Sequence, residues 1–182
     1  MPLDTSSPTP TTRSPKAIGV GAGLLAFGLV LGLLAGVLWG FLHPTYVIEI
    51  TDGTAMINAE ASDTSAEFTA IGWLTILSAV VGAALALVAW FKTGGGGIGT
   101  LIWVMAVAAA AAFTIVATGQ VVAQALHDVP PDHATSGTFT VAPAVNPHVA
   151  WLVAPFVSAL LYWMLNFFAL SAERSRRGGA SR

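Results

Sequence analysis

Cysteine and charge are scarce in this sequence. The 182 residues include no cysteine, so the chain forms no disulfide bond, no thiolate metal site and no cysteine nucleophile. Only 9% of its residues are charged, whereas a soluble domain carries about 25% because its surface must be wetted. A chain that is 55% apolar cannot cover a soluble globule with polar side chains. The composition therefore excludes a soluble enzyme, a secreted disulfide-stabilised module and a disordered chain.

An excess of positive charge is also missing. Seven Lys and Arg stand against nine Asp and Glu, which gives a formal net charge of −2. Such a chain has no basic surface that would attract nucleic acid. We therefore expect no nucleic-acid partner.

The apolar residues gather in four runs that are each long enough to cross a bilayer. A helix rises about 1.5 Å per residue, so about 20 residues span a hydrocarbon core of about 30 Å. The sequence predicts an all-α integral membrane protein with transmembrane helices at residues 17–42, 68–91, 98–126 and 149–172. Arg13 and Lys16 also suggest a signal peptide, but the first run is too long for a signal core of about 7–15 residues.

The basic residues indicate the orientation. All seven lie in the tails, at residues 1–16 and 173–182, or between the second and third runs. The other two loops, residues 43–67 and 127–148, contain none and hold seven of the nine acidic residues. Because Lys and Arg stay on the cytoplasmic side, we expect both termini to be cytoplasmic and both acidic loops to lie outside the plasma membrane. Tryptophans near the ends of the runs, including Trp39, are consistent with an aromatic belt.

Both tails have a composition that favours disorder. Residues 1–16 are rich in Ser, Thr and Pro, and residues 173–182 are rich in Ser, Gly and Arg. We expect a disordered N-terminal tail and a basic C-terminal tail that lies against anionic headgroups.

Two of the runs carry a stripe of small residues at four-residue spacing. Such a stripe lets another helix approach closely in lipid, where hydrophobicity alone does not drive association. We expect the glycine stripe of the first run to pack within the chain against the small stripe of the second run. Self-association of two copies through the glycine stripe is the alternative. The glycine stripe consists of Gly28, Gly32, Gly36 and Gly40, and the small stripe of Ser78, Gly82 and Ala86.

The membrane runs contain polar but no charged side chains. A proton-coupled pump, a voltage sensor or an ion-coupled carrier normally needs an ionisable residue inside the membrane, and none of the four runs contains one. We expect Gln120, Gln124 and Asn166 to form hydrogen bonds between helices. Pro155 is expected to kink the fourth run.

The first outer loop has the pattern of a β-hairpin. Asp52-Gly53 lies between two β-prone segments, which indicates a two-residue turn. In that register Ile48 faces Ile57, and one face of the hairpin is apolar, so we expect that face to lie against another surface. A lone hairpin is marginally stable in water. Residues 137–141 of the second loop are therefore expected to add a third strand.

The second outer loop contains the one cluster with metal-ligand chemistry, namely His127, Asp128, Asp132 and His133. Imidazole and carboxylate groups can bind zinc or manganese. The stiff segment Val129-Pro130-Pro131 separates the two pairs, which favours solvated loop residues over a metal site. We expect no metal, no cofactor and no catalytic residue. Residues 94–97 are all glycine but lack the Lys-Ser/Thr of a phosphate-binding loop, and we expect a flexible turn there.

The order of these features resembles a known family. A glycine-rich first run ends near Trp39, an outer hairpin follows, and the acidic stretch AEASDTSAEF at residues 59–68 leads into the second run. The segment PAVNPH at residues 143–148 then leads into a Pro-bearing fourth run. Over about residues 17–173 the chain resembles small actinobacterial four-helix integral membrane proteins of unknown function. The resemblance implies four crossings of an actinobacterial plasma membrane and assigns no reaction.

Together these features favour a non-enzymatic accessory or scaffold subunit of a larger plasma-membrane assembly. We expect it to dock through its outer loops and its small-residue helix faces, with other membrane proteins and the bilayer as its partners; a homo-oligomer is a further option. The alternative is a small oligomeric transporter or lipid-handling protein for uncharged or amphipathic cargo. A third alternative is a membrane enzyme that uses His127 or Asp132.

Overall fold

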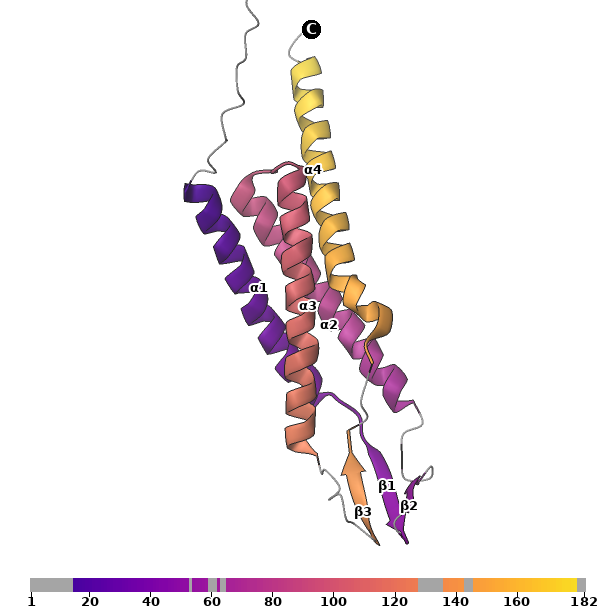
Figure 1. The fold of residues 1–182 in the computed structure, drawn as a ribbon. Helices are drawn as coiled ribbons and strands as arrows, with labels where there is room; N and C mark the ends of the chain where they lie inside the picture. The colour runs from indigo at the N-terminus through magenta and orange to yellow at the C-terminus, as the bar shows by residue number, and fades with distance from the viewer. Residues whose placement is uncertain are drawn as a thin grey trace, which may run out of the picture.

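Four long helices and a small sheet make up the computed structural model, which describes residues 15–52, 54–58, 62, 65–127, 136–142 and 146–179 (Figure 1). The helices are α1 (Pro15–Phe41), α2 (Ala66–Thr93), α3 (Ile98–Leu126) and α4 (Val153–Gly179). The strands are β1 (Tyr46–Thr51), β2 (Thr54–Ile57) and β3 (Ser136–Val141), and a short 3-10 helix, η1 (His148–Leu152), precedes α4.

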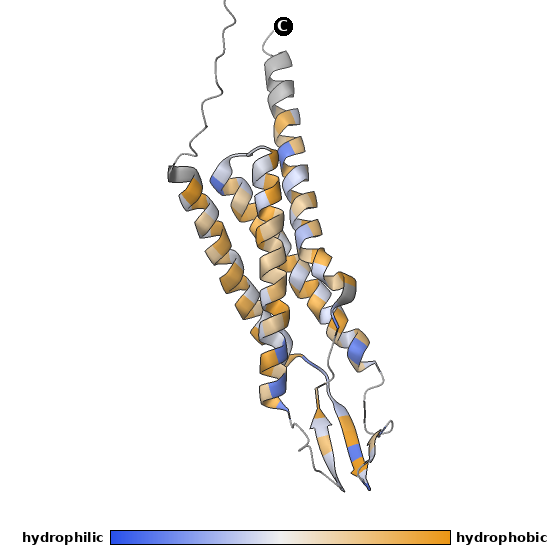
Figure 2. Cartoon of the chain, in the orientation of Figure 1, coloured by the Kyte–Doolittle hydropathy of each residue, from blue (hydrophilic) through white to orange (hydrophobic). Residues whose placement is uncertain are grey.

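Each of the four helices is long and apolar enough to cross a membrane. The candidate spans are Ile18–Phe41, Ala66–Thr93, Ile98–Leu126 and Val149–Ala172. Hydrophobic residues predominate along the coloured part of the helices, as Figure 2 shows. The predicted fold class, an all-α multi-pass membrane protein with a small sheet, is confirmed.

The helices form a bundle with two distinct ends. α2 and α3 form a central hairpin, and α1 and α4 pack against it on opposite sides. The beginning of α1 and the end of α4 lie at one end, which we call the tail end (Figure 1). The three strands lie at the other, which we call the sheet end.

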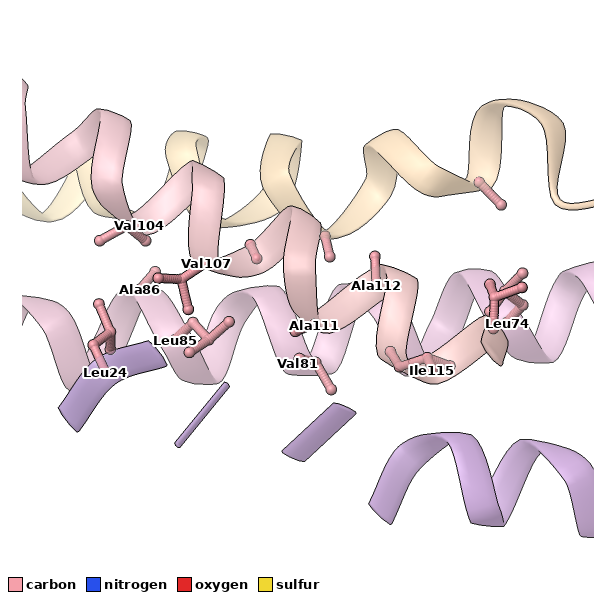
Figure 3. Close-up of a cluster of buried hydrophobic side chains, with 14 of the residues drawn as sticks. Leu24, Leu74, Val81, Leu85, Ala86, Val104, Val107, Ala111, Ala112 and Ile115 are labelled. Atoms are coloured by element: carbon pink, nitrogen blue, oxygen red, sulfur yellow. The ribbon is translucent and has the colours of Figure 1, made fainter. Parts of the chain in front are cut away.

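The core between the helices is aliphatic. Side chains of α2 and α3 fill it, with alanines between them that bring the helix backbones close (Figure 3). Such packing gains dispersion energy from close contact, the main source of helix association in lipid. The largest fully buried aliphatic side chains are Leu74, Leu85, Val104, Val107 and Ile115.

The sheet has the strand order β2-β1-β3, and both pairs are antiparallel. Ile48 pairs with Ile57 in β2 and with Phe139 in β3. Asp52 has a φ of 51° in the turn between β1 and β2, as a two-residue hairpin requires. The predicted hairpin register and the predicted third strand are both confirmed.

Pro155, the residue expected to kink the fourth run, lies near the start of α4. α4 begins at Val153, directly after η1, so Pro155 lies in its first turn. The first four N–H groups of a helix have no acceptor within the helix, and a proline there loses no hydrogen bond.

The end of α4 corrects the expected disorder of the C-terminal tail. The helix continues through residues 173–179 and projects past the other helices at the tail end (Figure 1). A long helix that has already formed extends at little cost, because each added residue gains a hydrogen bond without a new nucleation step. Residues 1–14 and 180–182 of the predicted tails lie outside the described residues.

Candidate functional site

The glycine stripe of α1 packs against α3, not against α2 as expected. A Cβ atom on Gly32 would lie 2.7 Å from the carbonyl oxygen of Ala111, and one on Gly36 would lie 2.7 Å from that of Ile115. Gly40 meets the next turn of α3 at Gly119. At the other end of the stripe, Gly28 lies against side chains of α3 and α2. α1 and α3 run in the same direction. Each successive glycine of the stripe therefore contacts the next turn of α3.

The small stripe of α2 is also occupied within the chain. Gly82 lies directly against the backbone of Ala154 in α4. Ser78 and Ala86, one turn to either side, are buried. The stripe thus serves the contact between α2 and α4. The two sets of small residues hold different helix pairs together rather than facing each other.

The three amide side chains expected to join helices have different positions. Gln124 is exposed, and Gln120 is half-buried. The amide nitrogen of Asn166 donates to the carbonyl oxygen of Tyr162, one turn earlier in the same helix, at 2.7 Å. That bond lies within α4, which differs from the interhelical bond expected for this residue. A hydrogen bond to the preceding turn of the same helix gives one amide N–H an acceptor without help from a neighbouring helix.

A buried tryptophan fixes the sheet end of the bundle. The Trp39 side chain is 0% exposed, and its indole N–H donates to the carbonyl oxygen of Ala70 in α2 at 2.8 Å. The ring also packs directly on Gly119 of α3. Trp39 therefore joins three helices and does not lie in the lipid interface, which corrects its expected place in an aromatic belt.

His43 lies next to this tryptophan, where the chain leaves α1 for β1. The two rings meet edge to face with their centroids 5.1 Å apart, and His43 is 6% exposed. Its Nδ1 donates to the carbonyl oxygen of Pro44 at 3.0 Å. Burial lowers the pKa of His43 below its usual 6.5. The hydrogen bond to Pro44 raises this pKa, and the nearby His127 lowers it further.

Acid should weaken the fold through His43. The unfolded chain binds a proton at this residue below about pH 6.5, whereas the folded protein binds it only at lower pH. Because the unfolded state then holds more protons, the free energy of unfolding should fall as the pH falls below about 6.5. Thermal unfolding in detergent at pH 7.5 and 5.0 measures the loss. A His43→Gln protein should lose less stability over this range, and an equal loss would mean that other groups are responsible.

The candidate metal ligands of the second outer loop lie mostly outside the described residues, since Asp128, Asp132 and His133 are not among them. The Nδ1 of His127 donates to the carbonyl oxygen of Ala123 at 2.7 Å. Among the residues that the structure describes, no three His, Cys, Asp or Glu side chains come together.

At the tail end, a buried tyrosine holds the turn of glycines at residues 94–97. The Tyr162 side chain is 1% exposed, and its hydroxyl accepts the N–H of Gly96 at 2.9 Å. The same hydroxyl lies 3.2 Å from the carbonyl oxygen of Gly96 and 3.2 Å from the Thr93 hydroxyl. The expected flexible turn is thus tied to α4. A side chain on Gly96 would collide with Thr100, which explains the glycine there.

Removal of this hydroxyl should loosen the turn. Tyr162→Phe leaves the part-buried N–H of Gly96 without its acceptor, and such a loss typically costs about 1–3 kcal/mol where the group is buried. The melting temperature of the protein in detergent should therefore fall. Tyr46→Phe removes a hydroxyl that has no hydrogen-bond partner among the described residues and should have little effect. Equal melting temperatures for the Tyr162→Phe protein and the wild type would contradict this role.

Comparisons with protein-family models, with curated proteins and with solved structures find no match for this chain. The function is therefore inferred from geometry. The feature that the bundle leaves uncovered is the sheet, which projects past the helix ends (Figure 1).

The sheet is covered unevenly. Ile50 of the central strand is buried. It pairs with Gly137 of β3, and the ring of Phe139 lies over that glycine. By contrast, all four residues of β2 are exposed, including Met56 at 68% and Ile57 at 60%. The chain itself therefore leaves the β2 part of the hairpin uncovered, and what lies against it stays a prediction. Sequence reasoning could not find this, because the apolar pattern is the same whether a face is covered from within or by a partner.

Proposed function

We propose that this chain is a non-enzymatic accessory or scaffold subunit of a larger plasma-membrane assembly, and that it docks through the sheet formed by its two outer loops. The observation that carries the proposal is β2, a strand with Met56 and Ile57 exposed on its two faces. An exposed edge strand presents unpaired backbone groups that can pair with another chain. The resemblance to actinobacterial membrane proteins supports a plasma-membrane location.

The proposed orientation places both termini in the cytoplasm and the sheet outside. The Lys and Arg residues of the sequence support it, since none lies in either loop that forms the sheet. The two termini of the bundle lie at the same end, as an orientation with both termini on one side requires.

Docking through the small-residue helix faces is not retained in this proposal. The glycine stripe is covered by α3, and Gly82 is covered by α4. The transporter alternative gains no support either, because the core between the helices is mainly aliphatic and Gln124 is exposed. The sheet is the surface on which this proposal rests.

Purification of the tagged full chain from its own membrane tests the proposal. At native expression level and in mild detergent, mass spectrometry should identify other membrane proteins in stoichiometric amounts. A chain recovered as a lone monomer, or only with further copies of itself, would overturn it.

A further inference from the structure

We propose that β2 is completed by an extended, positively charged segment of the partner, which pairs with its free edge as an additional strand. This inference rests on the proposed function. It specifies the charge and the backbone conformation of the partner segment that contacts the sheet. Proteins commonly recognise extended segments by strand addition, in which backbone hydrogen bonds supply affinity and side chains supply specificity.

The edge at β2 lacks the usual protection against pairing. β2 is an outer strand of the sheet, and among the described residues no strand pairs with its other side. Natural edge strands are normally shielded by charged residues, proline or a covering segment. The sequence of β2 is TAMI, which contains neither a charge nor a proline. The opposite outer strand is better covered, because Phe139 and Val141 of β3 are half-buried.

The register identifies the backbone groups that a new strand would use. The N–H of Asn58 donates to the carbonyl oxygen of Val47 at 3.0 Å, so this pair is hydrogen-bonded. In an antiparallel ladder bonded and non-bonded pairs alternate, so Ala55 and Ile57 belong to non-bonded pairs. Their N–H and C=O groups therefore point away from β1, toward the free edge.

The charge around the edge favours a cationic partner. Glu49 pairs with Met56 and is exposed on the same face of the sheet. The two loops that form the sheet hold seven acidic residues and no Lys or Arg. An acidic surface attracts a cationic segment and repels an anionic one. Such complementarity determines which partner binds more than how tightly it binds.

A second copy of this chain fits the edge poorly. The strands run along the long axis of the bundle (Figure 1). Two copies inserted in the same direction would present their β2 strands parallel to each other, whereas a symmetric pair of edge strands needs them antiparallel. Two acidic outer surfaces would also repel each other.

Peptide binding to the full chain tests this inference. The protein is placed in nanodiscs of zwitterionic lipid, so that the membrane itself attracts no cationic peptide. The two probes are fluorescent heptapeptides that alternate lysine with valine or glutamate with valine. The lysine peptide should bind at least tenfold more tightly than the glutamate peptide, and its binding should weaken as salt is added.

The variants separate edge pairing from general attraction. Ala55→Pro removes an N–H that points to the free edge, and it should weaken binding of the lysine peptide at least tenfold. Ala55→Val keeps that N–H and should bind like the wild type. Met56→Lys keeps the backbone unchanged and adds a positive charge beside Glu49, so it should weaken binding even if Ala55→Pro disturbs the hairpin.

Three results would overturn the inference: equal binding of both peptides, binding of the lysine peptide that Ala55→Pro does not weaken, or a dimer of the wild type that Ala55→Pro abolishes. The proposed function fails separately, when native purification recovers the chain alone. If membrane partners do co-purify but the peptide results are negative, the scaffold function stands and the docking strand is wrong.

Discussion

A Gly36→Leu protein should be less stable than the wild type by about 1–3 kcal/mol or more, because α1 must move away from α3 to make room for the side chain. A Cβ atom at this position would lie 2.7 Å from the carbonyl oxygen of Ile115 and 2.9 Å from the Cβ of Thr118. A backbone oxygen inside a helix cannot turn aside as a flexible side chain can. Thermal unfolding in detergent should show a clear drop in the melting temperature.

Gly23→Leu on the same helix is the matched control. Nothing lies within 4 Å of a Cβ atom at Gly23, so the leucine enters open space. Leucine is a better helix former than glycine by roughly 0.8 kcal/mol, and this variant should be as stable as the wild type or more stable. If Gly36→Leu behaves in the same way, α1 does not pack on α3 through its glycines.

Trp39→Ala should destabilise the protein by about 3–5 kcal/mol, the range for a buried tryptophan replaced by alanine. The change leaves a cavity between three helices and removes the hydrogen bond to Ala70. Trp39→Phe should cost less, since it keeps an aromatic ring on Gly119 and loses chiefly the indole N–H. Chemical unfolding in detergent, or retention of the folded form after heating, measures both effects.

Trp163 provides the comparison for Trp39. Its side chain is 58% exposed on the surface of α4, so Trp163→Ala removes little buried contact. The two alanine variants should therefore differ in stability by several kcal/mol. Equal losses would show that Trp39 does not hold the sheet end together.

The pattern of hydrophobicity and turn residues was sufficient to predict the spans and the hairpin. A run of more than 20 apolar residues has few structural options, and Asp52-Gly53 sets the register of the strands beside it. The same pattern could not identify which helix the glycine stripe contacts. Four glycines show that a backbone approaches closely, but α2 and α3 both offer small residues.

The two side chains that fix the ends of the bundle also escaped prediction. Trp39 bonds to a backbone group of α2, and Tyr162 bonds to a backbone group of the turn between α2 and α3. Nearly every residue has a backbone N–H and carbonyl group, so the sequence does not show which residue forms the hydrogen bond. Where a buried aromatic residue has a polar atom, the prediction can go only as far as saying that some acceptor or donor lies nearby.

The attachment of Tyr162 to the glycine turn has a consequence for the surrounding lipid. It places the end of α2 and the start of α3 beside the middle of α4, while apolar residues of α4 continue to Ala172. That remainder is about 15 Å long at 1.5 Å per residue. A bilayer of uniform thickness cannot match both lengths, and each ångström of mismatch costs a fraction of a kcal/mol. The leaflet at the tail end should therefore be thicker beside α4 than beside α1, which gives the protein one flank that favours longer acyl chains.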